Sequence, residues 1–188
     1  MEKEKFFETL SNYHPISAGL KAYLDYILKA QHLPNGLVQS TANFIEQPLL
    51  FIQHGSLRLF ALNEEERKEY TLRFFPDGTF LFPSHYLKAR DMPTFLHAID
   101  EVTIVGFDQR HFYNLYHNFR EFSTIIELLH GSEIQRMLYH SFMLQNTNAS
   151  QAYADFIRKY PTIAKSSQLQ HIASYLGIDN RTLSRIRR

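Results

Sequence analysis

The chain has 188 residues, of which 44% are hydrophobic and 14% aromatic, enough to bury the core of one large domain or of a moderate domain with a small one attached. It contains no cysteine, which excludes disulfides, iron-sulfur clusters and cysteine-ligated zinc. The formal net charge is +1, but residues 155–188 carry seven Lys and Arg against two Asp, which leaves −4 on residues 1–154. A basic tail on an acidic body is typical of a protein that meets a polyanion.

The N-terminal sequence MEKEKFF alternates acidic and basic residues, where a signal peptide has a basic start and an apolar run. No apolar stretch approaches the ~18–20 residues that span a bilayer. We therefore expect a soluble, cytoplasmic protein that does not bind membranes.

Residues 1–31 are predicted to be helical, because apolar residues recur there every three or four positions. From Leu33 the pattern changes to short apolar segments separated by turn residues, as in strands. The segments are GLVQSTANFI, LLFIQHGSLRLFAL, EYTLRFFPDGTFLF and FLHAIDEVTIVGF, and the turns or hairpins are marked by Asn35-Gly36, His54-Gly55 and Asp77-Gly78. Regularly spaced short strands predict an antiparallel sandwich or barrel.

After Asp108 the helical period returns and continues to about Leu144, with its apolar stripe interrupted only at Gly131. Because so long a helix is hard to bury on its own domain, we interpret the stripe as a dimer seam; a helix lying along its own sheet is the alternative. A shorter helix follows and ends at Pro161. The polar segment at residues 146–150 is the expected domain boundary.

Residues 168–188 contain two short amphipathic stretches on either side of Gly177. The first is predicted to run from about residue 168 to residue 176, with Ser166 or Ser167 as its N-cap. Gly177 then lies at a helix C-terminus, a position that favours positive φ.

The second stretch is predicted to begin after Asp179 or Asn180, which are both good N-caps. Small Ala173 lets the two helices approach, and Leu183 and Ile186 close a small core. This spacing predicts a helix-turn-helix, whose second helix enters the major groove of DNA. A helical hairpin that binds nothing is the alternative.

The solvent faces of the second helix are rich in arginine, which can donate two hydrogen bonds to the edge of guanine. Arg187 and Arg188 are assigned to phosphates, which add affinity without sequence information. The candidate DNA-binding residues are Gln168, Asn180, Arg181, Thr182, Ser184, Arg185, Arg187 and Arg188.

The segments HIASYLGI (171–178) and TLSRIR (182–187), together with GSLRLF (55–60) and EYTLRFF (69–75), resemble the Crp/Fnr family of bacterial transcription regulators. The resemblance covers most of the chain from about Leu33. It implies a β-roll sensor domain, a homodimer through the long helix and binding to double-stranded DNA, with RNA polymerase as a further candidate partner.

The expected fold class is therefore α+β. It comprises an N-terminal antiparallel β-roll, jelly-roll-like and similar to cyclic nucleotide-binding domains, with flanking helices, then a long dimerisation helix and a C-terminal helix-turn-helix. The expected division is residues 1–118 for the sensor domain with its N-terminal helices, 119–147 for the dimerisation helix and 148–188 for the DNA-binding domain.

Family members contact bases from positions that correspond here to Asn180, Arg181 and Arg185, and only Arg185 keeps the usual residue. The family's operator sequence is therefore not carried over to this chain. We also expect no β-hairpin wing after the second helix.

Family members that bind cyclic nucleotides use a cassette similar to GExxGE and a following arginine. The corresponding stretches here are GTFLFP (78–83) and PTFLHA (93–98). Thr79 and Pro83 replace both acids, and neither Thr94 nor Phe95 replaces the arginine. Because a buried phosphate needs a cationic partner, we expect no tight binding of cyclic AMP.

Other residues of this region could still form an effector pocket. Arg90 or His97 could supply the cation, and the phenylalanines could line an apolar pocket or belong to ordinary sheet core. The candidates are Gly78, Thr79, Phe80, Phe82, Arg90, Phe95 and His97.

The ten histidines do not have the spacing of metal ligands: no two are two residues apart, and the nearest pair, His111 and His117, does not share a helix face. Hydrolase, phosphate-loop and dinucleotide motifs are absent. Glu64, Glu65 and Glu66 are interpreted as a solvated hairpin tip. We expect no metal, no cofactor and no enzymatic activity.

The sequence thus predicts a homodimeric DNA-binding regulator whose β-roll has lost or exchanged the usual ligand chemistry, with an unknown effector. One alternative is a small-molecule-binding β-roll protein whose helical module does not bind DNA. Another is a constitutive regulator with a filled, ligand-free roll.

Overall fold

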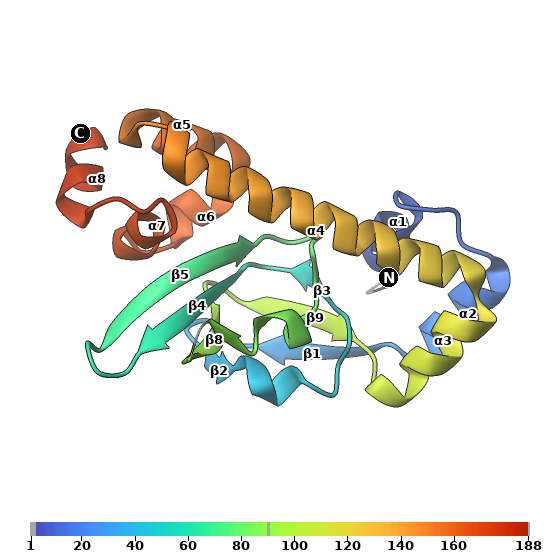
Figure 1. Ribbon diagram of the computed structural model, residues 1–188. Helices are drawn as coiled ribbons and strands as arrows, with labels where there is room; N and C mark the ends of the chain where they lie inside the picture. The colour runs from blue at the N-terminus through green and yellow to red at the C-terminus, as the bar shows by residue number, and fades with distance from the viewer. Residues whose placement is uncertain (1–2, 90, 188) are drawn as a thin grey trace.

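The computed structural model describes residues 3–89 and 91–187, and it places two antiparallel sheets beside one long helix (Figure 1). One sheet has the strand order β1-β9-β3-β6, and the other has the order β2-β8-β4-β5 with β7 added to β8. The strands are β1 (Lys29–Leu33), β2 (Val38–Ser40), β3 (Leu50–His54), β4 (Leu57–Asn63), β5 (Lys68–Phe75), β6 (Phe80–Leu81), β7 (Lys88–Ala89), β8 (Met92–Ala98) and β9 (Val102–Gly106).

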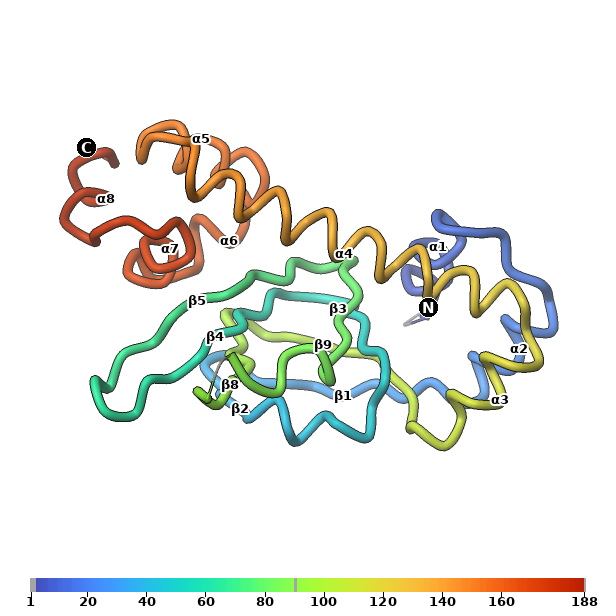
Figure 2. Tube along the Cα trace, in the orientation of Figure 1, coloured from blue at the N-terminus to red at the C-terminus, as the bar shows by residue number. Residues whose placement is uncertain are grey.

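The helices lie at the two ends of the sheets and along one side of them. The helices are α1 (Glu4–Ser11), α2 (Ala18–Ile27), α3 (Phe112–Asn118), α4 (Arg120–Asn146), α5 (Ala149–Lys159), α6 (Pro161–Ser166), α7 (Leu169–Tyr175) and α8 (Asn180–Ile186). The trace in Figure 2 shows α4 running from α2 and α3 at one end to α5–α8 at the other. None of the helices in the described ranges combines the length and the apolar character needed to cross a membrane.

The first three residues of strand β3, inside the β1-β9-β3-β6 sheet, are buried on both faces, which explains why LLFI in the sequence is a continuous apolar run. Side chains alternate between faces along a strand. Leu50 and Ile52 of β3 belong to the core between the two sheets, whereas Phe51 belongs to a second core under the helices.

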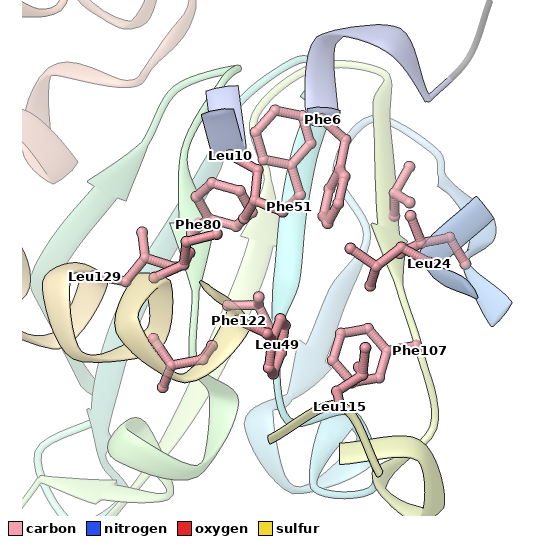
Figure 3. Packing of buried hydrophobic residues seen from close by; sticks show 14 of the residues in the cluster. Phe6, Leu10, Leu24, Leu49, Phe51, Phe80, Phe107, Leu115, Phe122 and Leu129 are labelled. Atoms are coloured by element: carbon pink, nitrogen blue, oxygen red, sulfur yellow. The ribbon is translucent and has the colours of Figure 1, made fainter. Parts of the chain in front are cut away.

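The second core is where the helices cover the outer face of this sheet (Figure 3). Phe6 of α1 packs edge-on against Phe51 and Phe80, with ring centroids 5.5 and 5.6 Å apart. Phe122 and Leu129 of α4 complete the cluster from the other side. The roll therefore uses α1 and α4 together as the cover of one sheet.

Gly55 turns the chain from one sheet into the other, since β3 pairs with β6 and β9 while β4 pairs with β5 and β8. Its φ is +82°, and a Cβ added there would lie 2.3 Å from the carbonyl oxygen of Glu101. Positive φ at Gly36 and Gly78 likewise fits the predicted turns. The predicted hairpin tip at residues 64–66 joins β4 to β5.

The expected fold class is confirmed, with three local corrections. The helical prediction for residues 1–31 is wrong at its end, because Lys29–Leu33 pairs with β9 and tertiary pairing outweighs local period. The predicted helix after Asp108 is broken at Phe119, which is extended between α3 and α4. Helix α4 itself continues through Gly131, where only the apolar stripe is interrupted. The segment GLVQSTANFI forms strand only at Val38–Ser40, before a 3₁₀ turn.

Candidate nucleic-acid interface

The turn at the centre of the helix-turn-helix has the conformation that the sequence predicts. Gly177 has φ +66°, and the amide of Ile178 donates to the carbonyl of Ala173 across the end of α7, a glycine-terminated helix end. Asp179 is the N-cap of α8, and its carboxylate accepts from the amide of Arg181 at 2.8 Å. The two helices are thus held at the turn by backbone geometry and one side-chain cap.

The prediction of Ser166 or Ser167 as the N-cap of α7 is wrong. The N-cap is Gln168, because α6 extends to Ser166 and uses Ser167 as its own C-cap. Helix α6 is not among the predicted elements, although proline at the first position of a helix is a recognised start signal and Pro161 holds that position. Pro161 therefore ends α5 and begins α6.

Most of the predicted DNA-binding side chains lie at the surface. Arg181, Arg185 and Arg187 are exposed, while Leu183 between them is buried and Ile186 packs on the core. Gln168 and Asn180 are exposed as well, and Thr182 and Ser184 are half-buried. Arg188 lies outside the described residues.

The helix-turn-helix packs on the roll through α7, which covers strand β5 at the edge of its sheet. The amide of Thr71 on β5 donates to the hydroxyl of Ser174 on α7 at 2.9 Å. Phe74 of β5 belongs to the same buried cluster as Phe156 and Ile172 of the helical part. The helix-turn-helix therefore shares a hydrophobic core with the roll, in addition to its covalent connection through α4.

A polar cluster that was not predicted lies at this junction between α7 and the roll. Arg58 is buried on β4 and pairs with Glu69, whose carboxylate is 3.7 Å from the imidazole of His171 on α7. His97 on β8 lies edge-on to His171, with ring centroids 5.8 Å apart. Four residues far apart in sequence meet only because β4, β5, β8 and α7 pack together.

The protonation of this cluster follows from its burial. Burial lowers the pKa of His171 from 6.5 to about 4, and the neighbouring Arg58 acts in the same direction, against the weaker effect of Glu69. Burial also lowers the pKa of His97. His171 is therefore neutral at pH 7.

A second buried polar group joins the roll to α4. The guanidinium of Arg73 on β5 pairs with the carboxylate of Glu133 on α4, and it donates to the hydroxyl of Tyr86 at 2.7 Å. Burial lowers the pKa of Arg73 to about 10, so the residue stays charged. Arg136, one turn along α4, lies 4.0 Å from the same carboxylate. This group occupies the space between the roll and the long helix.

The predicted effector-pocket residues are divided between two places. Gly78, Thr79, Phe80 and Phe82 line a cavity of about 120 Å³, closed by Tyr13, which follows α1, and by residues of α4 that include Glu133. This volume lies well below the ~300–1,000 Å³ of small-molecule sites.

Phe95 and His97 lie on β8 in the other sheet, outside the lining of that cavity. Phe95 stacks on Phe60 with ring centroids 5.4 Å apart, and His97 belongs to the cluster at α7. Arg90 falls outside the described residues. Phe95 and His97 are thus close to the cassette residues in sequence, but their side chains lie away from the cavity that those residues line.

The long helix α4 has two faces of different character. Phe122, Ile126 and Leu129 are buried against the roll. The opposite face carries large apolar residues at spacings of four to six positions, and Leu138 on this face is 65% exposed. The exposed residues of this seam face are Leu128, Ile134, Leu138 and Phe142.

Within residues 3–89 and 91–187, no three His, Cys, Asp or Glu side chains come together as a metal site. No protein-family model matches the chain, and no curated protein matches it in sequence.

Solved structures share this fold over most of their length. One is described as a transcriptional regulator of the Crp/Fnr family from Eubacterium rectale, with a TM-score of 0.68 and 16% identity over 93% of this chain and 85% of that chain. Another is a mutant of CooA from Carboxydothermus hydrogenoformans, with a TM-score of 0.64 and 21% identity over 96% and 81%. A third is a cyclic nucleotide-binding domain containing protein from Listeria monocytogenes, with a TM-score of 0.66 and 10% identity over 97% and 88%.

The likeness to Crp/Fnr regulators is thus confirmed at the level of the fold. The descriptions of these three neighbours name no enzymatic activity.

The neutral state of His171 predicts an acid-labile junction. Because the folded-state pKa lies below the ordinary 6.5, the stabilisation by the neutral imidazole is fully present above pH 6.5. It is lost as the pH falls from 6.5 to about 4, by up to about 1.4 kcal/mol of unfolding free energy per pH unit. Replacing His171→Gln should make this loss shallower in urea unfolding, and His54→Gln, at an exposed turn, is the control. Identical slopes for both variants and the parent would contradict the assignment.

Proposed function

We propose that the protein is a DNA-binding transcription regulator of the Crp/Fnr type, that it works as a homodimer, and that its β-roll does not take cyclic AMP. The observation that carries the proposal is the exposed arginine face of α8, presented by a helix-turn-helix on a Crp-like scaffold. The proposal brings with it a cytoplasmic location and no catalytic role.

We assign one role to each of the three expected parts of the chain. Residues 1–118 form the roll, 119–147 the dimerisation helix and 148–188 the DNA-binding part. RNA polymerase is a candidate partner of the DNA-bound dimer.

The proposed DNA contacts start from the direction in which α8 faces. Since Leu183 is buried, Arg181 and Arg185, one turn apart, are left on the outer side of the helix. In the major groove, arginines at these positions can reach base edges, and Arg187 can neutralise a phosphate. Gln168, Asn180, Thr182 and Ser184 are proposed as accessory contacts, together with Arg188.

The proposed dimer is supported by the seam face of α4. Gly131, Ile134, Leu138 and Phe142 lie three or four residues apart, as in the contact seam of paired helices. Side chains of this size exposed in a row on one helix mark an interaction surface. Pairing of two α4 helices would place two α8 helices on one face of DNA, with half-sites about 34–36 Å apart.

The proposal for the roll is supported by the residues that fill the cassette region. The cavity of about 120 Å³ is too small for a nucleotide, and Glu133 adds a carboxylate to its lining. A phosphate placed beside this carboxylate would meet repulsion. Arg73 is already paired with the carboxylate, and Arg136, the arginine of the lining, lies 4.0 Å from it. A roll filled by its own side chains favours control by something other than cyclic AMP.

Removal of the outward arginines should abolish sequence preference. In a selection from random duplex DNA, the parent should enrich a palindrome, and the double variant Arg181→Ala with Arg185→Ala should enrich none, since each bidentate contact to guanine contributes about 1–3 kcal/mol of discrimination. Arg158→Ala, on α5 and paired with Asp155, is the matched control. Failure of the parent to retain any duplex at low salt would contradict the proposal.

A charge on the seam face should separate the protomers. Leu138→Asp leaves the single chain intact because the side chain is exposed there, but in a dimer it would bury a carboxylate. We expect dimer affinity to fall at least about 100-fold, which corresponds to about 2.7 kcal/mol, in sedimentation equilibrium. Tyr113→Asp, equally exposed on α3, should leave the association state unchanged. A parent protein that sediments as a monomer would refute the seam.

Cyclic AMP should give no saturable heat in calorimetry at concentrations that fill a micromolar site. The physical reasons are the small volume of the cassette cavity and the carboxylate of Glu133 in its lining, which pairs with Arg73 and lies 4.0 Å from Arg136. The same samples should show no thermal stabilisation, because a ligand that binds the folded state raises its melting temperature. A micromolar isotherm would contradict this part of the proposal while leaving DNA binding untouched.

A further inference from the structure

A larger cavity lies away from the cassette, lined by the C-terminal end of α4, by α5 and by the turn after α7. Figure 1 shows these elements together at one end of the molecule. Its volume is about 490 Å³, within the ~300–1,000 Å³ range of small-molecule sites. It is four times the size of the cassette cavity, and none of the effector-pocket candidates among the described residues lines it.

The walls of this cavity are mainly apolar and aromatic. Met143 and Leu144 come from α4, Phe156 comes from α5, and Leu176 and Ile178 flank the helix-turn-helix glycine. Leu144 lies close over that glycine, since its Cδ2 would be 3.2 Å from a Cβ added at Gly177. A ligand in this space would bury an apolar body between α4 and the turn.

One cationic side chain at the cavity lacks an ionic partner. The ammonium of Lys159 lies 5.3 Å from the ring centroid of Tyr139 and 5.4 Å from that of Tyr160, and no carboxylate in the described ranges is within 4 Å of it. Arg158 and Asp155, which also line the cavity, pair with each other at 2.8 Å. The lining thus offers a single unneutralised positive charge beside an apolar space.

The position of the cavity on α4 keeps it clear of the seam face. At 3.6 residues per turn, His140 and Leu144 lie on the side of the helix opposite Leu138 and Phe142. His140 is turned inward, where it stacks on Tyr175 with ring centroids 4.2 Å apart. Pairing of two chains through the seam face would therefore leave the cavity accessible.

We propose that this cavity binds an amphipathic monocarboxylate, with its apolar body against Met143, Leu144 and Phe156 and its carboxylate on Lys159. A single ammonium held between two tyrosine rings favours one anionic head group, since a charge-assisted contact is the strongest polar interaction that the lining offers. The surrounding apolar side chains supply the remaining affinity through burial. An acyl chain and an aromatic acid share this chemistry.

The test uses the full-length protein and calorimetry with two probes below their micelle-forming concentrations, decanoate for the acyl source and 4-phenylbutyrate for the aromatic source. Saturable binding of either acid supports the site and identifies the source. Lys159→Met, which keeps the apolar stem, should weaken binding about tenfold. Decanol, which lacks the charge, should bind the parent and this variant equally. Lys165→Met, on α6 and outside the lining, should bind as the parent does.

Ala152→Leu provides a second variant that fills the cavity and keeps Lys159. It should reduce the binding of both acids and of decanol, with circular dichroism confirming the fold of each variant. Absence of saturable binding of both acids to the parent would overturn the proposal, as would binding that neither variant weakens. Because no DNA is present in these measurements, their outcome is separate from that of the proposed function.

Discussion

Strand β5 lies at the edge of its sheet, and the need to cover this edge is the constraint on which the arrangement of the molecule depends. An edge strand leaves backbone amides and carbonyls without partners and invites pairing with another chain. Here α7 covers that edge, and the hydroxyl of Ser174 accepts from the amide of Thr71. Helix α7 thus also covers the β2-β8-β4-β5 sheet at its β5 edge, and this packing holds α7 and the neighbouring α8 against the roll.

Two buried charged groups connect the parts that this packing brings together. Arg58 and Glu69 meet His171 of α7, and Arg73 meets Glu133 of α4. Breaking a buried pair from one side leaves an uncompensated charge, which is strongly destabilising. Any rearrangement of α7 or α4 relative to the roll must therefore separate or re-pair these charges, so the two groups favour a small number of discrete arrangements over a continuous range.

The sequence predicts the elements whose signals are local. The glycine turn, the Asp179 cap and the buried Leu183 follow from residue type and spacing, and the structure has all three. The start of β1 at Lys29 could not be predicted, because only its pairing with β9 makes that segment a strand. The cluster around His171 and the separation of His97 from the cassette depend on which strands become neighbours, and no spacing in the chain encodes that.

Gly131 lies at the middle of α4 with open space around the position of its absent side chain. Towards the N-terminus the helix packs on the roll, and towards the C-terminus it carries α5 and the turn after α7. A glycine inside a helix costs about 1 kcal/mol relative to alanine, so Gly131 stabilises the helical conformation of α4 less than an alanine there would. Amide protons near Gly131 should exchange with solvent sooner than those one or two turns away. The least helix-favouring residue of α4 thus lies between the segment that packs on the roll and the segment that contacts α5 and the turn after α7.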